Sequence, residues 1–144
     1  MAEDTVTQAA VLAGLDERPC ITQTLRLHGW QENSEAEKPL NVYGEDWSGI
    51  ERIIKENPIF AERLHENLPY TMAEVIWAIR NEMAHTVEDI LSRRTRALLL
   101  DAKASVEIAP QIAELMASEL GYDINWQEQQ VQKYNELARG YMLD

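Results

Sequence analysis

The chain has 144 residues, of which 45% are hydrophobic and 26% are charged, so it can form one globular domain with its own core. Its 13 basic and 25 acidic residues give a formal net charge of −12, which argues against non-specific nucleic-acid binding and against docking on anionic lipid. The single cysteine, Cys20, excludes an internal disulfide and a thiolate metal cluster and fits a reducing cytoplasm.

The first part of the chain predicts one short helix followed by an arm. Between residues 3 and 13 apolar side chains recur at helical spacing, and Gly14 is placed to end the helix. Residues 15–44 are punctuated by glycine and proline and include the polar stretch QENSEAEK, so we expect a linker or a docking arm. The N-terminus has neither a basic region nor a long apolar run, which argues against a secretory signal.

From Asp46 onward the hydrophobic pattern is helical. An apolar stripe over residues 47–54 predicts one helix, and Pro58 suits the first turn of a second short helix over residues 58–65. Thr71 and Glu74 form a capping box, in which each side chain satisfies a free backbone N–H at a helix start. We expect the helix that follows to bury an apolar side that extends to Met83.

Two further helices are predicted by their caps. Thr86 with Asp89 forms a second box-like start, before a helix that reaches a group of arginines. Asp101 can cap a long helix that ends at Gly121. Pro110 lies inside this helix, so we expect a kink or a split at that position.

The last helix is predicted to start at Asn125, which forms a third capping pattern with Glu128. Its apolar side runs at helical spacing through Tyr134 to Tyr141. The chain therefore predicts an all-α fold of about five or six helices after an extended N-terminal linker. Unbroken apolar runs such as Ala97–Leu100 are far too short to span a bilayer.

The motifs of common enzyme chemistry are missing. No three glycines make the G-x-G-x-x-G turn of dinucleotide-binding folds. Gly44 and Gly49 have the spacing of a phosphate-binding loop, but Ile50 and Glu51 follow where lysine and serine or threonine are required. The three histidines are scattered, and no serine lies in a G-x-S-x-G elbow. We expect no catalytic residue, no cofactor-binding residue and no metal ligand in this chain.

One basic cluster departs from the acidic composition. It consists of Arg93, Arg94, Arg96 and Lys103. In one interpretation the guanidinium groups bind a phosphate or a carboxylate. In the other they form ion pairs, within the chain or across to another domain, with acids such as Glu74, Glu88, Asp89 and Asp101.

The four tryptophans fall into two classes. Trp77 and Trp126 lie on predicted apolar faces, where core packing is expected. Trp30 and Trp47 flank the polar arm, which makes them candidates for contact with a partner as well as for packing within the chain.

Three segments, in order along the chain, carry a family resemblance. They are ERPCITQTLRLHGW at 17–30, LPYTMAEVIWAIRNEMAHTVEDILSRRTRALLLDAKAS at 68–105 and APQIAELMASELGYDINWQEQQVQKY at 109–134. They resemble the C-terminal helical domain of FAD-dependent glycerol-3-phosphate dehydrogenases and the related glycerophosphate oxidases. The most specific pieces are AEV at 73–75 and SRRTR at 92–96.

The resemblance implies a part of an oxidoreductase. The whole enzyme would oxidise sn-glycerol 3-phosphate to dihydroxyacetone phosphate, with hydride passing to FAD and electrons to a quinone or to oxygen. Its FAD and main substrate groups belong to the upstream part, so this chain alone is expected to be inactive and free of cofactor. Dehydrogenase and oxidase stay open as alternatives. The full enzyme would be cytoplasmic or peripheral at the inner membrane.

By the same resemblance, residues 1–30 would be the end of the FAD domain plus a linker arm, and residues 31–144 the cap-like helical domain. Its partners would be the FAD-binding domains of the same polypeptide. The candidates for an interdomain or phosphate-facing role are Arg93, Arg94, Thr95, Arg96, Trp30 and Trp47. The alternative is a stand-alone helical protein-interaction module without enzyme activity.

Overall fold

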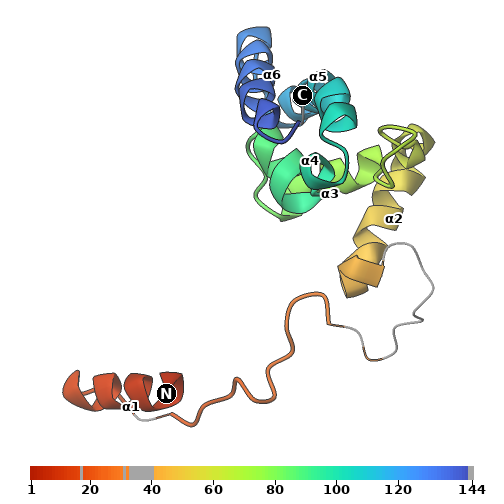
Figure 1. Cartoon of the computed structure of the whole chain (residues 1–144). Helices are drawn as coiled ribbons and strands as arrows, with labels where there is room; N and C mark the ends of the chain where they lie inside the picture. Colours follow the sequence, from red (N-terminus) through yellow and green to blue (C-terminus); the bar gives the residue numbers. More distant parts are fainter. Residues whose placement is uncertain (17, 31, 33–40, 143–144) are drawn as a thin grey trace. The chain divides into compact units, whose positions relative to one another are not determined.

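The computed structural model describes residues 1–16, 18–30, 32 and 41–142, which divide into two compact units, Met1–Glu45 and Asp46–Asp144. Across these residues the regular elements are helical, and the only extended pairing is a single bridge between Arg63 and Thr71. The all-α prediction is therefore confirmed (Figure 1). The polar stretch QENSEAEK lies outside the described residues except for Glu32.

The first unit contains α1 (Ala2–Leu12), which buries none of its residues. Gly14 follows in a left-handed conformation with φ 65°, so the predicted helix end is confirmed. A short 3-10 helix, η1 (Asn41–Asp46), begins in this unit and ends at the first residue of the second one. There the N–H of Glu45 donates to the carbonyl of Gly29 at 3.1 Å. Gly44 approaches the same carbonyl so closely that a side-chain carbon would overlap it.

The second unit begins with α2 (Trp47–Glu56), whose buried face includes Ile50 and Ile53. The predicted helix over residues 58–65 is wrong in length, because η2 (Pro58–Ala61) is a single 3-10 turn. Glu62 leaves the helical region with ψ 141°. The backbone then pairs across a loop, with Leu64 N–H donating to the Tyr70 carbonyl at 2.9 Å.

Helix α3 (Met72–Asn81) starts at the predicted capping box. The carboxylate of Glu74 accepts from the N–H of Thr71 at 2.7 Å. The expectation that Met83 is buried is wrong: this residue lies after the helix with φ 57° and is 78% exposed. The left-handed turn ends the helix and places Ala84 in the core instead.

The π-helix η3 (Asp89–Arg94) and the four-residue helix α4 (Ala97–Leu100) lead to α5 (Ala102–Leu120). Asp101 caps α5 as predicted, accepting from the N–H of Ala104 at 3.0 Å. Helix α5 continues through Pro110, so of the two expected alternatives, a kink or a split, the split does not occur. Pro110 is exposed, and the buried residues that flank it hold both halves of the helix against the core.

Helix α6 (Ile124–Arg139) starts two residues earlier than predicted. Its cap is Asp123, which accepts from the N–H of Trp126 at 2.8 Å, so the Asn125 pattern is wrong. Asp123 has the extended backbone that a cap requires. Tyr141 follows the helix and is 52% exposed, so it does not continue the buried side.

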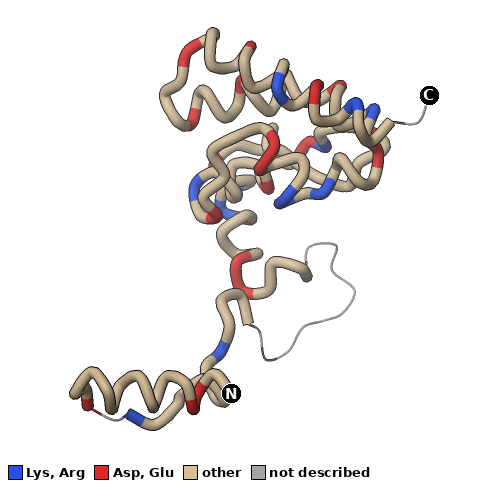
Figure 2. The backbone as a smooth tube through the Cα atoms, turned by 60° about the vertical axis from the view of Figure 1, so that its left-hand side comes forward, with Lys and Arg blue, Asp and Glu red and all other residues tan. Residues whose placement is uncertain are grey.

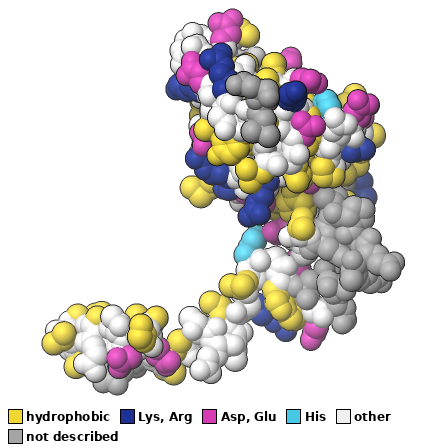
Figure 3. Space-filling model, in the orientation of Figure 1, with side chains coloured by type: hydrophobic (Ala, Val, Ile, Leu, Met, Phe, Trp, Pro, Cys, Tyr) yellow, Lys and Arg dark blue, Asp and Glu magenta, His cyan; other side chains and the backbone are white. Residues whose placement is uncertain are grey.

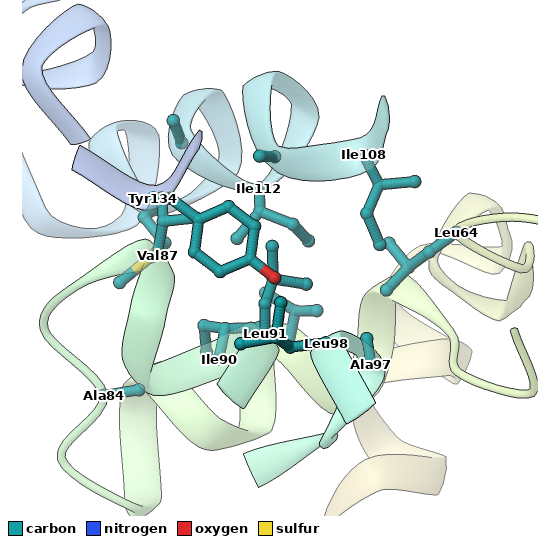
Figure 4. Packing of buried hydrophobic residues seen from close by; sticks show 14 of the residues in the cluster. Leu64, Ala84, Val87, Ile90, Leu91, Ala97, Leu98, Ile108, Ile112 and Tyr134 are labelled. Carbon is teal, nitrogen blue, oxygen red and sulfur yellow. The ribbon is translucent and has the colours of Figure 1, made fainter. Parts of the chain in front are cut away.

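The core of the second unit is formed by α3, η3, α4, α5 and α6 (Figure 4). Tyr134 of α6 reaches into it with a fully buried ring. Its hydroxyl donates to Ser105 Oγ at 2.8 Å, and Ser105 in turn donates to the carbonyl of Ala102 at 2.7 Å. Burial raises the pKa of Tyr134 above its ordinary value. This chain of hydrogen bonds joins α6 to the first turn of α5.

Candidate functional site

The residues Arg93, Arg94, Thr95 and Arg96 are called the arginine segment. The helical turn that leads into this segment is fixed at its start by the predicted Thr86–Asp89 pair. Asp89 N–H donates to Thr86 Oγ1 at 3.1 Å, and Thr86 N–H donates to the Asp89 carboxylate at 3.0 Å. Burial alone would raise the pKa of Asp89, but hydrogen bonds from Thr86 and His85, with Arg93 nearby, lower it overall. The box-like start is therefore confirmed, with an ionised carboxylate at its centre.

Thr95 fixes the end of the same segment. Its N–H donates to the carbonyl of Ile90, five residues back, at 2.9 Å, and its hydroxyl donates to the same carbonyl at 2.8 Å. The hydroxyl also accepts from the N–H of Ala97 at 3.4 Å. Thr95 is only 4% exposed. Its side chain thus closes the wide π-turn and connects it to α4.

Arg93 is paired within the segment. Its guanidinium lies 2.6 Å from the carboxylate of Glu88 and 2.8 Å from that of Asp89. Both acids were among those expected for the ion-pair interpretation. The Arg93 side chain is 52% exposed, so solvent screens both contacts and their contribution to stability is modest.

Arg94 connects the segment to the end of α3. Its Nη2 donates to the backbone carbonyl of Glu82 at 2.6 Å, and its Nε lies 3.3 Å from the carboxylate of the same residue. Sequence reasoning missed Glu82 as a partner. The two residues are 12 positions apart, and their approach depends on how α3 ends, so no local spacing could have indicated it.

Arg96 differs from the other two arginines. Its backbone is left-handed at φ 57°, its side chain is exposed, and it forms no ion pair with any residue that the structure describes. Burial and the charge of Glu74 raise the pKa of Tyr70, and the positive charge of Arg96 partly opposes them, which places Arg96 near that phenol. Leu99 and Leu100 follow in α4 and are 64% and 62% exposed.

The remaining candidates lie elsewhere. Trp47 is the half-buried first residue of α2, which packs on α3 and η2. Trp30 belongs to the first unit, where the guanidinium of Arg26 lies 4.0 Å above its ring. Lys103 is exposed in the first turn of α5. The structure therefore gathers Arg93, Arg94, Thr95 and Arg96 on one segment, and the interdomain roles of Trp30 and Trp47 stay predictions.

A groove of about 550 Å³ lies along α5 and α6. Its lining includes Pro110, Ile124, Val131, Asn135 and Arg139, together with glutamine and glutamate side chains. The residues that line this groove do not include a general base next to a nucleophilic side chain. In the described part of the chain, no group of three or more histidine, cysteine, aspartate or glutamate side chains could hold a metal ion. Within the part of the chain that the structure describes, no helix is long and apolar enough to cross a membrane.

Known proteins resemble the chain over most of its length. The family described as the C-terminal domain of alpha-glycerophosphate oxidase matches residues 5–130. The mitochondrial glycerol-3-phosphate dehydrogenase of Rattus norvegicus is 33% identical over 99% of this chain and 22% of its own length. The probable mitochondrial glycerol-3-phosphate dehydrogenase of Caenorhabditis elegans is 33% identical over 92% of this chain and 21% of its own length.

A plant relative shows the same pattern of coverage. Glycerol-3-phosphate dehydrogenase SDP6, mitochondrial, of Arabidopsis thaliana is 28% identical over 98% of this chain and 27% of its own length. No solved structure is significantly similar to the chain. The chain thus spans only about a fifth to a quarter of the curated relatives that it matches.

Proposed function

The chain belongs to the family of C-terminal domains of alpha-glycerophosphate oxidase, and we propose that it forms the C-terminal helical domain of an FAD-dependent glycerol-3-phosphate dehydrogenase. One observation carries this proposal: relatives with that name match almost all of this chain, while the chain matches about a fifth of them. The chain would then be one part of a much larger enzyme.

The reaction of the whole enzyme would be the oxidation of sn-glycerol 3-phosphate to dihydroxyacetone phosphate. FAD would accept the hydride, and electrons would continue to a quinone or to oxygen. The sequence has no dinucleotide turn, and the described residues offer neither a metal-binding group nor a base paired with a nucleophile in the α5–α6 groove. FAD and glycerol 3-phosphate would therefore be bound by the rest of the polypeptide, and this chain alone would be inactive.

The role of this chain would be to pack on the flavin domains. Candidate contacts are the arginine segment, Trp30 and Trp47. The arginine segment is rigidly placed, because Thr95 closes the π-turn and Arg94 is bonded to the end of α3. A surface held in this way can meet another domain without a large loss of side-chain freedom.

The test exchanges the matching region of the rat enzyme for this chain. Glycerol 3-phosphate-dependent dye reduction and bound flavin are measured for three proteins: the rat enzyme, the exchanged enzyme and a version with the region deleted. We expect activity in the exchanged enzyme, little or none in the deleted one, and no bound flavin in the isolated chain.

Two results would contradict the proposal. An exchanged enzyme that holds flavin but does not reduce the dye would show that this chain does not complete the enzyme. Flavin bound stoichiometrically by the isolated chain would show that the cofactor site lies in this chain. Either result would favour the alternative of an independent helical module with other partners.

A further inference from the structure

Helix α4 presents two leucines away from the core. Successive helical residues are rotated by about 100°. Ala97 and Leu98 therefore share one side of this four-residue helix, while Leu99 and Leu100 share the opposite side. The first two are buried, at 0% and 3% exposed, and the second two are 64% and 62% exposed. Together with Arg96, which precedes the helix, Leu99 and Leu100 are called the α4 surface.

The conformation that presents the α4 surface is costly. A left-handed backbone at a residue other than glycine is uncommon and strained, and Arg96 has φ 57°. It is maintained by Thr95, whose hydroxyl joins the carbonyl of Ile90 to the N–H of Ala97. Buried Ala97 and Leu98 anchor the following turn. The surrounding structure thus fixes the direction in which the two leucines and the arginine point.

The charges around the α4 surface indicate what it can meet. Arg93 and Arg94 are already matched by Glu88, Asp89 and Glu82, whereas Arg96 forms no ion pair among the residues described. Elsewhere on the helical unit, basic and acidic positions are interspersed (Figure 2). Hydrophobic side chains are also exposed in patches between the charged ones (Figure 3). A complementary surface would be apolar and would carry a carboxylate for the guanidinium of Arg96.

A second copy of this chain is a poor match. A two-fold contact through the α4 surface would bring Arg96 toward its own copy, and each chain carries a net charge of −12. Polypeptide outside this chain is the better source, because the relatives are four to five times as long as the part they share with it.

We propose that the α4 surface, formed by Arg96, Leu99 and Leu100, docks on an apolar, carboxylate-bearing face of the flavin-binding part of the same polypeptide. This inference rests on the proposed function and adds to it the contact through which the domain packs. Leu99 and Leu100 form the apolar centre of the contact, and Arg96 sets its orientation.

Hydroxyl-radical labelling tests the contact directly. The isolated chain and the exchanged rat enzyme are labelled side by side, with Ile124, which is 65% exposed on α6, as the reference. We expect labelling of Leu99 and Leu100 to fall by about fivefold or more in the exchanged enzyme, relative to Ile124, because the centre of an interface excludes water. Equal protection of all three residues would overturn the proposal.

Substitutions provide the second arm. Leu99→Asp/Leu100→Asp is compared with Ile124→Asp, and Arg96→Glu is compared with Lys133→Glu, which changes an exposed cation on α6 in the same way. The α4 variants are expected to lower the melting temperature of the exchanged enzyme by about 2 °C or more while leaving that of the isolated chain almost unchanged. The control variants are expected to change neither.

The outcomes separate the two proposals. Dye reduction by the exchanged enzyme together with unprotected leucines would retain the proposed function and overturn the α4 contact. Loss of dye reduction in the unmodified exchanged enzyme would overturn the proposed function itself. Protection of Leu99 and Leu100 in the isolated chain that grows with its concentration would assign the surface to self-association and overturn docking on the flavin-binding part.

Discussion

Gly49 in α2 allows close packing against Trp77 of α3, and Gly49→Ala tests this contact. A methyl group at this position would overlap the six-membered ring of Trp77. Alanine also favours a helix over glycine by up to about 1 kcal/mol, whereas overpacking of a filled contact typically costs about 1–3 kcal/mol. We therefore expect a net destabilisation of about 1 kcal/mol, which corresponds to a fall in Tm of about 4–8 °C for a unit of this size.

The sign of the Gly49→Ala effect should depend on Trp77. Trp77→Leu removes the overlapping ring atoms, so in that background Gly49→Ala should stabilise the chain through helix propensity alone. Urea unfolding followed by far-UV circular dichroism measures all four members of this double-mutant cycle. Gly140→Ala is the matched control, because the atom nearest to its new methyl group is at an ordinary 3.5 Å. An equal free-energy change for Gly49→Ala in both backgrounds would refute the packing argument.

Three further changes test the fold and its pH dependence. Tyr134→Phe should cost about 1 kcal/mol in urea unfolding, because Ser105 loses a buried donor. Since burial raises the pKa of Tyr134 above 10.0, the stability it provides is present below pH 10 and is lost as the pH rises through the folded value, so Tyr134→Phe should flatten the alkaline side of the stability profile. Arg80→Ala should lower the free energy of unfolding by about 0.5–1 kcal/mol, because it removes two hydrogen bonds from the guanidinium to the Glu119 carboxylate, at 2.7 and 2.8 Å. These hydrogen bonds are partly exposed, so this difference should disappear in high salt. A double-mutant cycle with Glu119→Gln measures that coupling. The pKa of Asp89 lies below 3.8, so its contribution is complete well above pH 3.8 and is lost as the pH falls through the folded value; Asp89→Asn should flatten the acid side of the stability profile.

The features predicted correctly from the sequence depend on chemistry within one helical turn. The Thr71–Glu74 box, the Thr86–Asp89 pair and the Asp101 cap all join groups three residues apart. The pairing of Arg93 with two nearby acids is similarly local. At this range the order of residue types along the chain decides which groups can meet, so spacing was sufficient.

The features that were missed depend on contacts farther away. The second short helix ends early because residues 62–64 pair with the backbone near Tyr70. Met83 lies outside the core because its left-handed backbone ends the helix, and the next residue, Ala84, is buried instead. For α6, the cap is Asp123 in place of the predicted Asn125, and Asp123 has the extended backbone of a cap. In each case the local sequence permits more than one arrangement, and tertiary packing selects one.

The α4 surface could not have been found by spacing, because its key residue breaks a local rule. Arginine carries no preference for the left-handed conformation, and an unbroken apolar run such as Ala97–Leu100 has no spacing that shows which of its members are buried. Local rules tend to fail where a protein meets a requirement beyond its own fold. Here a π-turn, a strained arginine and two displayed leucines fall within 12 consecutive residues, 89–100. The isolated helical unit gains nothing evident from displaying Leu99 and Leu100, whereas burying their remaining exposed surface, 64% and 62%, against a partner would recover about 1–2 kcal/mol for each. The segment therefore makes energetic sense as one side of a domain contact.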